Sequence, residues 1–396
     1  MPSKRKTSDD LRAAAALAAE ATTGVTRVVQ EMHRTIASGP AILGAPLAGP
    51  ARALTAVAYL GVRGVTRLVA AGVDRLLAQL EPLLGENAPG PQREALIAAL
   101  NGVLGDYLQA THNPLAIDMG FRIHGETLPL DRAALVKAVP QASPRVLLLV
   151  HGSSMNDLGW TRLGHNHGEA LARDLGLTPV GVLYNSGLHV SQNGRALATL
   201  LQTLVDSWPV PVQEITLLAH SMGGLVARSA CHYGEDLPWR GRLKNLVCLG
   251  TPHHGAALER AGNWADFFMT LSRYSAPLAP LAKIRSAGVT DLRFGSVLDE
   301  DWEGADRFAK RADARTPLPL PVGVACFAIA ATTARAPRAR LPGDGLVSVD
   351  SALGKHPQTQ LTLKFPEEHQ WIGFGMAHLD LLNRAEVYER ILGWLQ

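Results

Sequence analysis

Short apolar runs alternate with segments of helical apolar spacing from about residue 116 onward. The runs lie at 145–150, 180–184, 214–218, 246–250, 322–330 and 360–365, and the helical segments at 168–174, 193–208, 225–232 and up to Trp394. Such runs are typical of strands buried on both faces. With a hairpin-like opening at 121–130, they predict a mostly parallel central sheet flanked by helices, with reactive loops at the strands' carboxyl ends.

The first 115 residues have a different pattern. Helical spacing occupies 11–37 and 52–80, which a stretch rich in glycine and proline at 39–50 separates. A third helix is expected at 92–110, after Pro91. We therefore expect an N-terminal helical region over residues 1–115 and a second domain over residues 116–396.

The strand rhythm lapses between residues 255 and 318. Aromatic residues gather there beside prolines, and Trp264, Phe267 and Phe268 are the first of them. An insertion after a strand is the usual place for a cap over an active site, so a helical lid is expected at about 256–318, with these aromatics lining an apolar acyl pocket. The alternative is a pair of helices that only covers the sheet.

A nucleophile candidate stands between the run at 214–218 and the helix at 225–232. The segment 217–224 reads Leu-Leu-Ala-His-Ser-Met-Gly-Gly, so Ser221 occupies a strand-to-helix turn. Such an elbow exposes a serine hydroxyl and aims the next backbone N–H at a developing oxyanion. Ala219 replaces the first glycine of the usual Gly-x-Ser-x-Gly pattern, and it is still small. The structural alternative is that Ser221 only caps the helix.

Three further segments complete a candidate site in the order serine, acid, histidine. The strand at 145–150 runs into His-Gly-Ser-Ser, so the backbone N–H groups of Ser153 and Met222 are the expected oxyanion donors. Asp344 lies between two glycines after the strand at 322–330, which makes it the candidate acid. His378 lies on a loop at the start of the last helix, which makes it the candidate base.

The segments 219–224, 249–255, 344–348 and 378–380 together resemble signatures of the α/β-hydrolase superfamily, and within it the bacterial lipase and esterase branch. They occur in order between residues 116 and 396. The resemblance implies the α/β-hydrolase fold and no cofactor. It implies Ser221 as nucleophile, His378 as base, Asp344 as acid, and Ser153 and Met222 as oxyanion donors.

The chain has 14 histidines, and several of them are alternatives to His378 as the base or candidates for other roles. His220 and His151 are interpreted as packing and bracing residues. His253 and His254 follow the run at 246–250 and either line the pocket or make loop hydrogen bonds. His165 and His167 stand two residues apart without neighbouring carboxylates or cysteines, so no metal site is predicted there.

Other carboxylates are alternatives to Asp344 as the candidate acid. Asp350, Glu367 and Glu368 are interpreted as surface or cap residues. In secreted lipases an aspartate two residues after the catalytic histidine often binds calcium, and Asp380 matches that position. Arg384 stands where another oxygen ligand would be needed, so calcium is not expected.

Composition agrees with a folded enzyme. The 396 residues are 47% hydrophobic and 18% charged, with a net charge of +3, which gives no indication of a nucleic-acid partner. Cys231, Cys248 and Cys326 are odd in number and lie in predicted strands and a helix, which favours a reducing compartment, the cytoplasm, over a disulfide framework.

Membrane contact is an open alternative for the N-terminal region. No stretch of roughly 18 apolar residues is free of a charge or proline, so no transmembrane helix is expected. Arg63, Arg67 and Arg75 follow one side of the helix at 52–80. This side is compatible with peripheral membrane contact, with packing on the second domain, and with oligomerisation.

These observations together predict a serine hydrolase that cleaves carboxylic esters of small molecules or lipids. An amidase, thioesterase, polyester hydrolase or acyltransferase on the same scaffold is the alternative. A non-catalytic binding protein is the third, since a fold does not guarantee a function.

Overall fold

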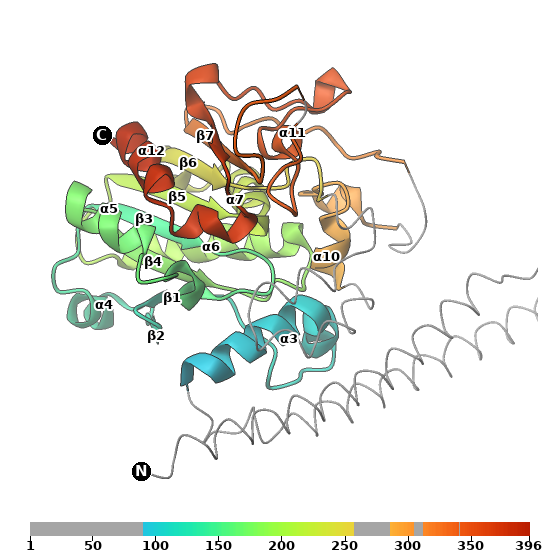
Figure 1. Ribbon diagram of the computed structural model, residues 1–396. Coiled ribbons are helices and arrows are strands. Elements are labelled where there is room, and N and C mark those ends of the chain that lie inside the picture. Colours follow the sequence, from blue (N-terminus) through green and yellow to red (C-terminus); the bar gives the residue numbers. More distant parts are fainter. Residues whose placement is uncertain (1–89, 257–285, 305–311, 340) are drawn as a thin grey trace, which may run out of the picture. The chain divides into compact units, whose positions relative to one another are not determined.

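The computed structural model describes residues 90–256, 286–304, 312–339 and 341–396. In this part of the chain an eight-stranded sheet has the order β2-β1-β4-β3-β5-β6-β7-β8 (Figure 1). β1 (Gly120–Ile123) pairs antiparallel with β2 (Glu126–Thr127) and with β4, and the pairs from β4 to β8 are parallel. The predicted mostly parallel sheet is confirmed.

The predicted apolar runs form most of its strands. The parallel strands are β3 (Arg145–Val150), β4 (Thr178–Leu183), β5 (Glu214–His220), β6 (Leu243–Leu249), β7 (Ala325–Thr332) and β8 (Gln370–Phe374). β3 and β5 are buried almost along their whole length, because helices cover both faces of the sheet.

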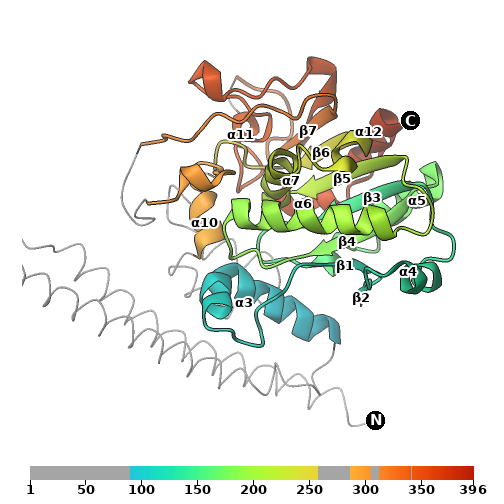
Figure 2. The same ribbon diagram turned by 180° about the vertical axis from the view of Figure 1, so that it is seen from behind.

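The helices form a layer on each face. They are α3 (Gly90–Ala110), α4 (Arg132–Ala138), α5 (His167–Leu175), α6 (Val190–Ser207), α7 (Met222–Tyr233), α10 (Ala287–Asp291), α11 (Val349–Ala352) and α12 (Ala385–Leu395). α5 and α12 lie over one face, and α6 and α7 lie side by side over the other (Figures 1 and 2). A side chain at Gly194 of α6 would lie 2.2 Å from Ser229 Oγ of α7, so glycine lets the two helices approach closely.

The strand predicted at 360–365 is wrong. A short 3₁₀ turn occupies Thr359–Leu361, and the last strand of the sheet is β8, which pairs with β7. Leu361, Leu363 and Phe365 alternate because each buries its side chain from a loop, and Pro366 then follows without an N–H to donate. Alternation alone therefore mimicked a strand.

The chain divides into two compact units by contact density. Residues 97–263 and 285–396 form the unit that contains the sheet, and it includes most of α3, the third predicted helix. The expected boundary at residue 115 stays a prediction. The predicted helices at 11–37 and 52–80 lie outside the described residues, as does most of the expected lid. Among the described residues, no helix is long and apolar enough to cross a membrane.

Candidate active site

Ser221 occupies a sharp turn between β5 and α7. Its backbone has φ 54° and ψ −126°, a combination that residues with a side chain rarely adopt. The Ser221 N–H donates to the Leu249 carbonyl at 2.8 Å, which ties the turn to the end of β6. Strain of this kind persists only where the surrounding structure imposes it, and it is the geometry expected of a nucleophile elbow.

Glycines make this turn fit against its neighbours. A side chain at Gly223 would lie 2.3 Å from the Val150 carbonyl oxygen, and one at Gly224 would lie 2.0 Å from Thr251 Oγ1. Ala219 is different, because it lies within β5 and pairs with Val150 and Cys248 of the neighbouring strands. A small side chain is accommodated there, which explains why the elbow tolerates alanine in place of the first glycine.

Asp344 and His378 are brought together from loops that follow β7 and β8. Asp344 Oδ2 accepts a hydrogen bond from His378 Nδ1 at 2.7 Å. The other carboxylate oxygen accepts the backbone N–H groups of Leu346 and Val347 at 2.9 and 2.8 Å. Gly343 and Gly345, with φ of 81° and 98°, form the turn around the carboxylate. Both side chains are buried, and the bond orients the imidazole.

The imidazole of His378 packs beside the elbow. Its ring centroid lies 4.7 Å from that of His220, the residue before Ser221, and His220 Nε2 donates to the His378 carbonyl at 3.3 Å. Nε2 of His378 is buried and hydrogen-bonds to none of the described residues. In the neutral ring Nδ1 carries the proton and donates it in the hydrogen bond to Asp344, so Nε2 keeps its lone pair as a proton acceptor.

The loop after β3 adjoins Ser221. A side chain at Gly152 would lie 3.0 Å from Ser221 Cβ, so the segment holding Ser153 passes close to the elbow. His151 braces this loop as expected: its ring stacks on Tyr184 at 4.2 Å, and the Tyr184 hydroxyl donates to the His151 carbonyl at 2.8 Å. Burial lowers the pKa of His151 to about 4, so it is neutral at pH 7.

Two bracing residues were not found from the sequence. Tyr184 supports His151, and Ser186 Oγ accepts the backbone N–H of Ser154 at 2.9 Å. Ser154 itself has φ 59°, so this loop is also held in an uncommon conformation. Their position in the sequence could have indicated this role, because both residues follow closely after β4, at the sheet edge where the elbow lies.

Comparison with known proteins finds one family that is similar to part of the chain. Residues 189–318 match the family model described as PGAP1-like alpha/beta domain, and this range contains α6, the Ser221 elbow and β6. This match spans only part of the chain, which has the α/β-hydrolase fold. No curated protein matches it in sequence. The resemblance to this superfamily that the sequence motifs indicated is confirmed.

Solved structures similar to this chain include a Bacillus licheniformis lipase in its mature form, at 17% identity and a TM-score of 0.40, covering 62% of this chain and 91% of that one. A lipase-esterase related protein from Clostridium acetobutylicum has 15% identity and a TM-score of 0.37, covering 64% and 95%. A Legionella pneumophila phospholipase has 16% identity and a TM-score of 0.34, covering 52% and 45%.

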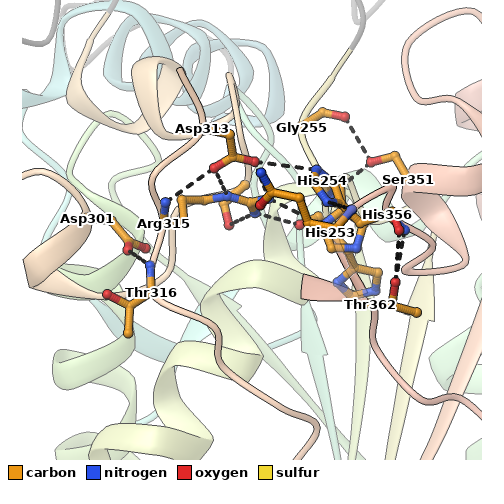
Figure 3. A network of polar contacts seen from close by, with 12 residues as sticks. His253, His254, Gly255, Asp301, Asp313, Arg315, Thr316, Ser351, His356 and Thr362 are labelled. Atoms are coloured by element: carbon orange, nitrogen blue, oxygen red, sulfur yellow. Dashed lines mark hydrogen bonds and ion pairs between the residues drawn. The ribbon is translucent and has the colours of Figure 1, made fainter. Parts of the chain in front are cut away.

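The predicted pocket-lining residues separate into two groups. His253 and His254 follow β6. His254 contacts Arg315 in a polar network (Figure 3), and His253 contacts Arg228. Their role in lining a substrate pocket stays a prediction. Trp264, Phe267 and Phe268 lie outside the described residues.

His165, His167 and Asp380, the candidates for metal binding, make hydrogen bonds within the protein. His165 Nε2 and His167 Nδ1 bond to each other at 2.8 Å, and Asp380 Oδ2 accepts the Ala377 N–H at 2.9 Å, at the start of the 3₁₀ helix His378–Leu382. No group of three or more metal-ligating side chains occurs in the described part of the chain.

The alternative acids and the three cysteines differ from the candidate site residues in their exposure and burial. Asp350, Glu367 and Glu368 are exposed. Burial raises the pKa of the thiols to about 12, which keeps them protonated and unreactive; these are Cys231, Cys248 and Cys326.

Proposed function

We propose that this α/β hydrolase cleaves carboxylic esters through an acyl-enzyme formed on Ser221. The observation that carries the proposal is the 2.7 Å bond between Asp344 and His378, made at the sheet edge where Ser221 occupies its strained turn. Serine, histidine and aspartate at such an edge are the groups that acyl transfer needs.

In the first half of the reaction, His378 Nε2 takes the proton of Ser221 Oγ as that oxygen attacks the ester carbonyl carbon. The imidazolium then gives the proton to the leaving alcohol. The Asp344 carboxylate holds the imidazole in the tautomer with Nδ1 protonated and stabilises its positive charge. In the second half, His378 activates a water that hydrolyses the acyl-enzyme and releases the acid.

The tetrahedral intermediates carry negative charge on the former carbonyl oxygen. The backbone N–H groups of Ser153 and Met222 are the proposed donors to it. Losing one oxyanion donor typically costs on the order of 10²–10³ in rate. Because these donors belong to the main chain, a change of either side chain is expected to matter less than a change of Ser221. The motif resemblance to lipases and esterases favours an ester as the substrate.

Hydrolysis of p-nitrophenyl butyrate by the Ser221→Ala variant tests the proposal. Turnover is expected to fall by about 10⁴-fold or more, since no nucleophile remains. Ser207→Ala is the matched control, because it removes a hydroxyl at the end of α6. Turnover by Ser221→Ala within tenfold of the wild type would refute the acyl-enzyme mechanism.

A further inference from the structure

Two glycines of α3 face the loops that follow β3 and β4. Gly102 and Gly105 are three residues apart and therefore lie on one face of the helix. A side chain at Gly102 would lie 1.8 Å from Ser154 Oγ, and one at Gly105 would lie 1.8 Å from Asn185 Oδ1. Glycine inside a helix weakens the helix relative to alanine, so the close approach of the two loops gives these glycines a purpose.

Hydrogen bonds hold the loop after β4 against α3. Asn185 Nδ2 donates to the Gly105 carbonyl at 3.0 Å, and Asn185 Oδ1 accepts the Gly187 N–H at 3.0 Å. Between these two residues, Ser186 Oγ accepts the backbone N–H of Ser154 at 2.9 Å. The loop after β4 therefore joins α3 to the loop after β3, in addition to the direct contact of Gly102 with Ser154.

A second element also holds α3. At the start of α10, Ser286 Oγ donates to the Gly102 carbonyl at 2.6 Å, and the Ala287 N–H donates to Asp106 Oδ2 at 3.1 Å. The two helices lie beside each other (Figures 1 and 2). Because α3 is bonded on this side, it cannot move away from a methyl group added at Gly102 without breaking these bonds. The loop that contains Ser154 has to move instead.

The loop after β3 is thus fixed on both sides of its proposed oxyanion donor. A side chain at Gly152 would lie 3.0 Å from Ser221 Cβ, and Ser154 contacts α3. Ser153 stands between them. Ser154 has φ 59°, a value that is uncommon for serine and persists only where the surroundings impose it. A displacement of Ser154 therefore also displaces the N–H of Ser153, the residue before it.

We propose that α3 is a positioning element of the active site: it holds Ser154 in its conformation and thereby aims the Ser153 N–H at the oxyanion. The inference rests on the proposed function, because an oxyanion forms only if Ser221 attacks an ester. It also gives a catalytic purpose to a helix that the sequence pattern placed in the N-terminal helical region.

Ester hydrolysis by the Gly102→Ala variant tests the inference. A displaced oxyanion donor weakens binding of the transition state and leaves binding of the ester unchanged. We expect kcat for p-nitrophenyl butyrate to fall by about 10²-fold, with KM within about threefold of the wild type. Gly393→Ala is the matched control, because it adds the same methyl group to α12 with nothing within 4 Å, and it is expected to keep the kcat of the wild type.

The double variant Gly102→Ala/Ser154→Gly separates positioning from a general loss of folding. Replacing Ser154 by glycine removes the Oγ and Cβ atoms that the added methyl group meets, and glycine adopts a positive φ without strain. We expect kcat to recover by at least about tenfold over Gly102→Ala. If Gly102→Ala lost activity because it weakened the fold, a second glycine would not restore it.

Hydrogen exchange in the full-length protein supplies a measurement that does not depend on catalysis. The Ser154 N–H, bonded to Ser186, is expected to exchange at least about tenfold faster in Gly102→Ala and at the wild-type rate in Gly393→Ala. If the wild type hydrolysed no ester, the proposed function would fail, and this measurement would still decide whether α3 holds the loop. A Gly102→Ala variant with unchanged exchange at Ser154, or with kcat within about threefold of an active wild type, would overturn the inference and leave the proposed function intact.

Discussion

Asp344 and His378 are joined twice, although 34 residues separate them in the chain. The carboxylate accepts a hydrogen bond from His378 Nδ1 at 2.7 Å, and the Asp344 carbonyl accepts one from the backbone N–H of His378 at 3.1 Å. The loops after β7 and β8 are therefore joined to each other at the proposed acid and base. Because the backbone bond fixes the loop, the side-chain bond is free to set the imidazole's orientation and tautomer.

Asp344→Asn tests the side-chain bond alone. The amide keeps the shape of the carboxylate and can still accept the N–H groups of Leu346 and Val347, so the loop is expected to fold normally. It loses the charge that stabilises the imidazolium, and its NH₂ favours the wrong tautomer of His378. We expect kcat/KM for an activated ester to fall by about 10³–10⁴-fold, with little change in Tm. A loss below tenfold would show that the carboxylate does not assist the base.

The buried histidines predict loss of stability in acid. Burial lowers the pKa of His151 and of His167 to about 4 in the folded protein, against 6.5 for an exposed imidazole. Between pH 6.5 and 4 the unfolded chain binds protons that the folded chain does not, so stability decreases as the pH falls through this window. Each residue is expected to cost about 1–2 kcal/mol at pH 5.

Urea unfolding at pH 7.5 and pH 5 measures this effect. His151→Phe keeps an aromatic ring against Tyr184 and removes the titrating group, so its stability is expected to change less between the two pH values than that of the wild type. Equal unfolding free energies of the wild type at both values would contradict the assignment of neutral buried rings.

Gly223→Ala tests the crowding at the elbow. The added methyl group would lie 2.3 Å from the Val150 carbonyl oxygen, which forces α7 or β3 to shift. We expect a loss of about 1–3 kcal/mol in stability, together with a loss of ester hydrolysis because Ser221 moves with the turn. Urea unfolding and initial rates check the two effects separately.

Gly393→Ala is the control for this substitution. Gly393 lies in α12, with nothing within 4 Å of the position of an added Cβ. Alanine in a helix favours folding, so stability is expected to stay the same or to rise by up to about 1 kcal/mol. A Gly223→Ala variant as stable and as active as this control would contradict the close packing described at the elbow.

The sequence predicted the sheet well because buried parallel strands need continuous apolar runs. The run at 145–150 coincides with β3, and 214–218 lies within β5. The strand prediction at 360–365 was wrong because Leu361, Leu363 and Phe365 alternate in a loop that is buried on one side. The short helix α4 was not predicted, because its seven residues are too few to show a helical repeat of apolar positions.

The candidate site was recognisable for a related reason. Ser221, Asp344 and His378 stand at loops after strands or at helix starts, where sequence position alone indicates exposure to a common edge. Tyr184, Ser186 and Arg228 were not found, because their roles depend on contacts between residues far apart in the chain. Arg228 illustrates this limit: on a helix it has the pattern of an ordinary basic residue, and only the folded structure shows that it is buried.

Covalent labelling by a fluorophosphonate tests the central claim most directly, because the probe reacts with a serine only when a base and an oxyanion site activate it. The full-length protein is labelled, digested and analysed by mass spectrometry, with the His378→Ala variant alongside. The account predicts one phosphonylated peptide, modified at Ser221, and a labelling rate at least about 10²-fold lower in His378→Ala. Labelling absent from Ser221, or equally fast without His378, would contradict it.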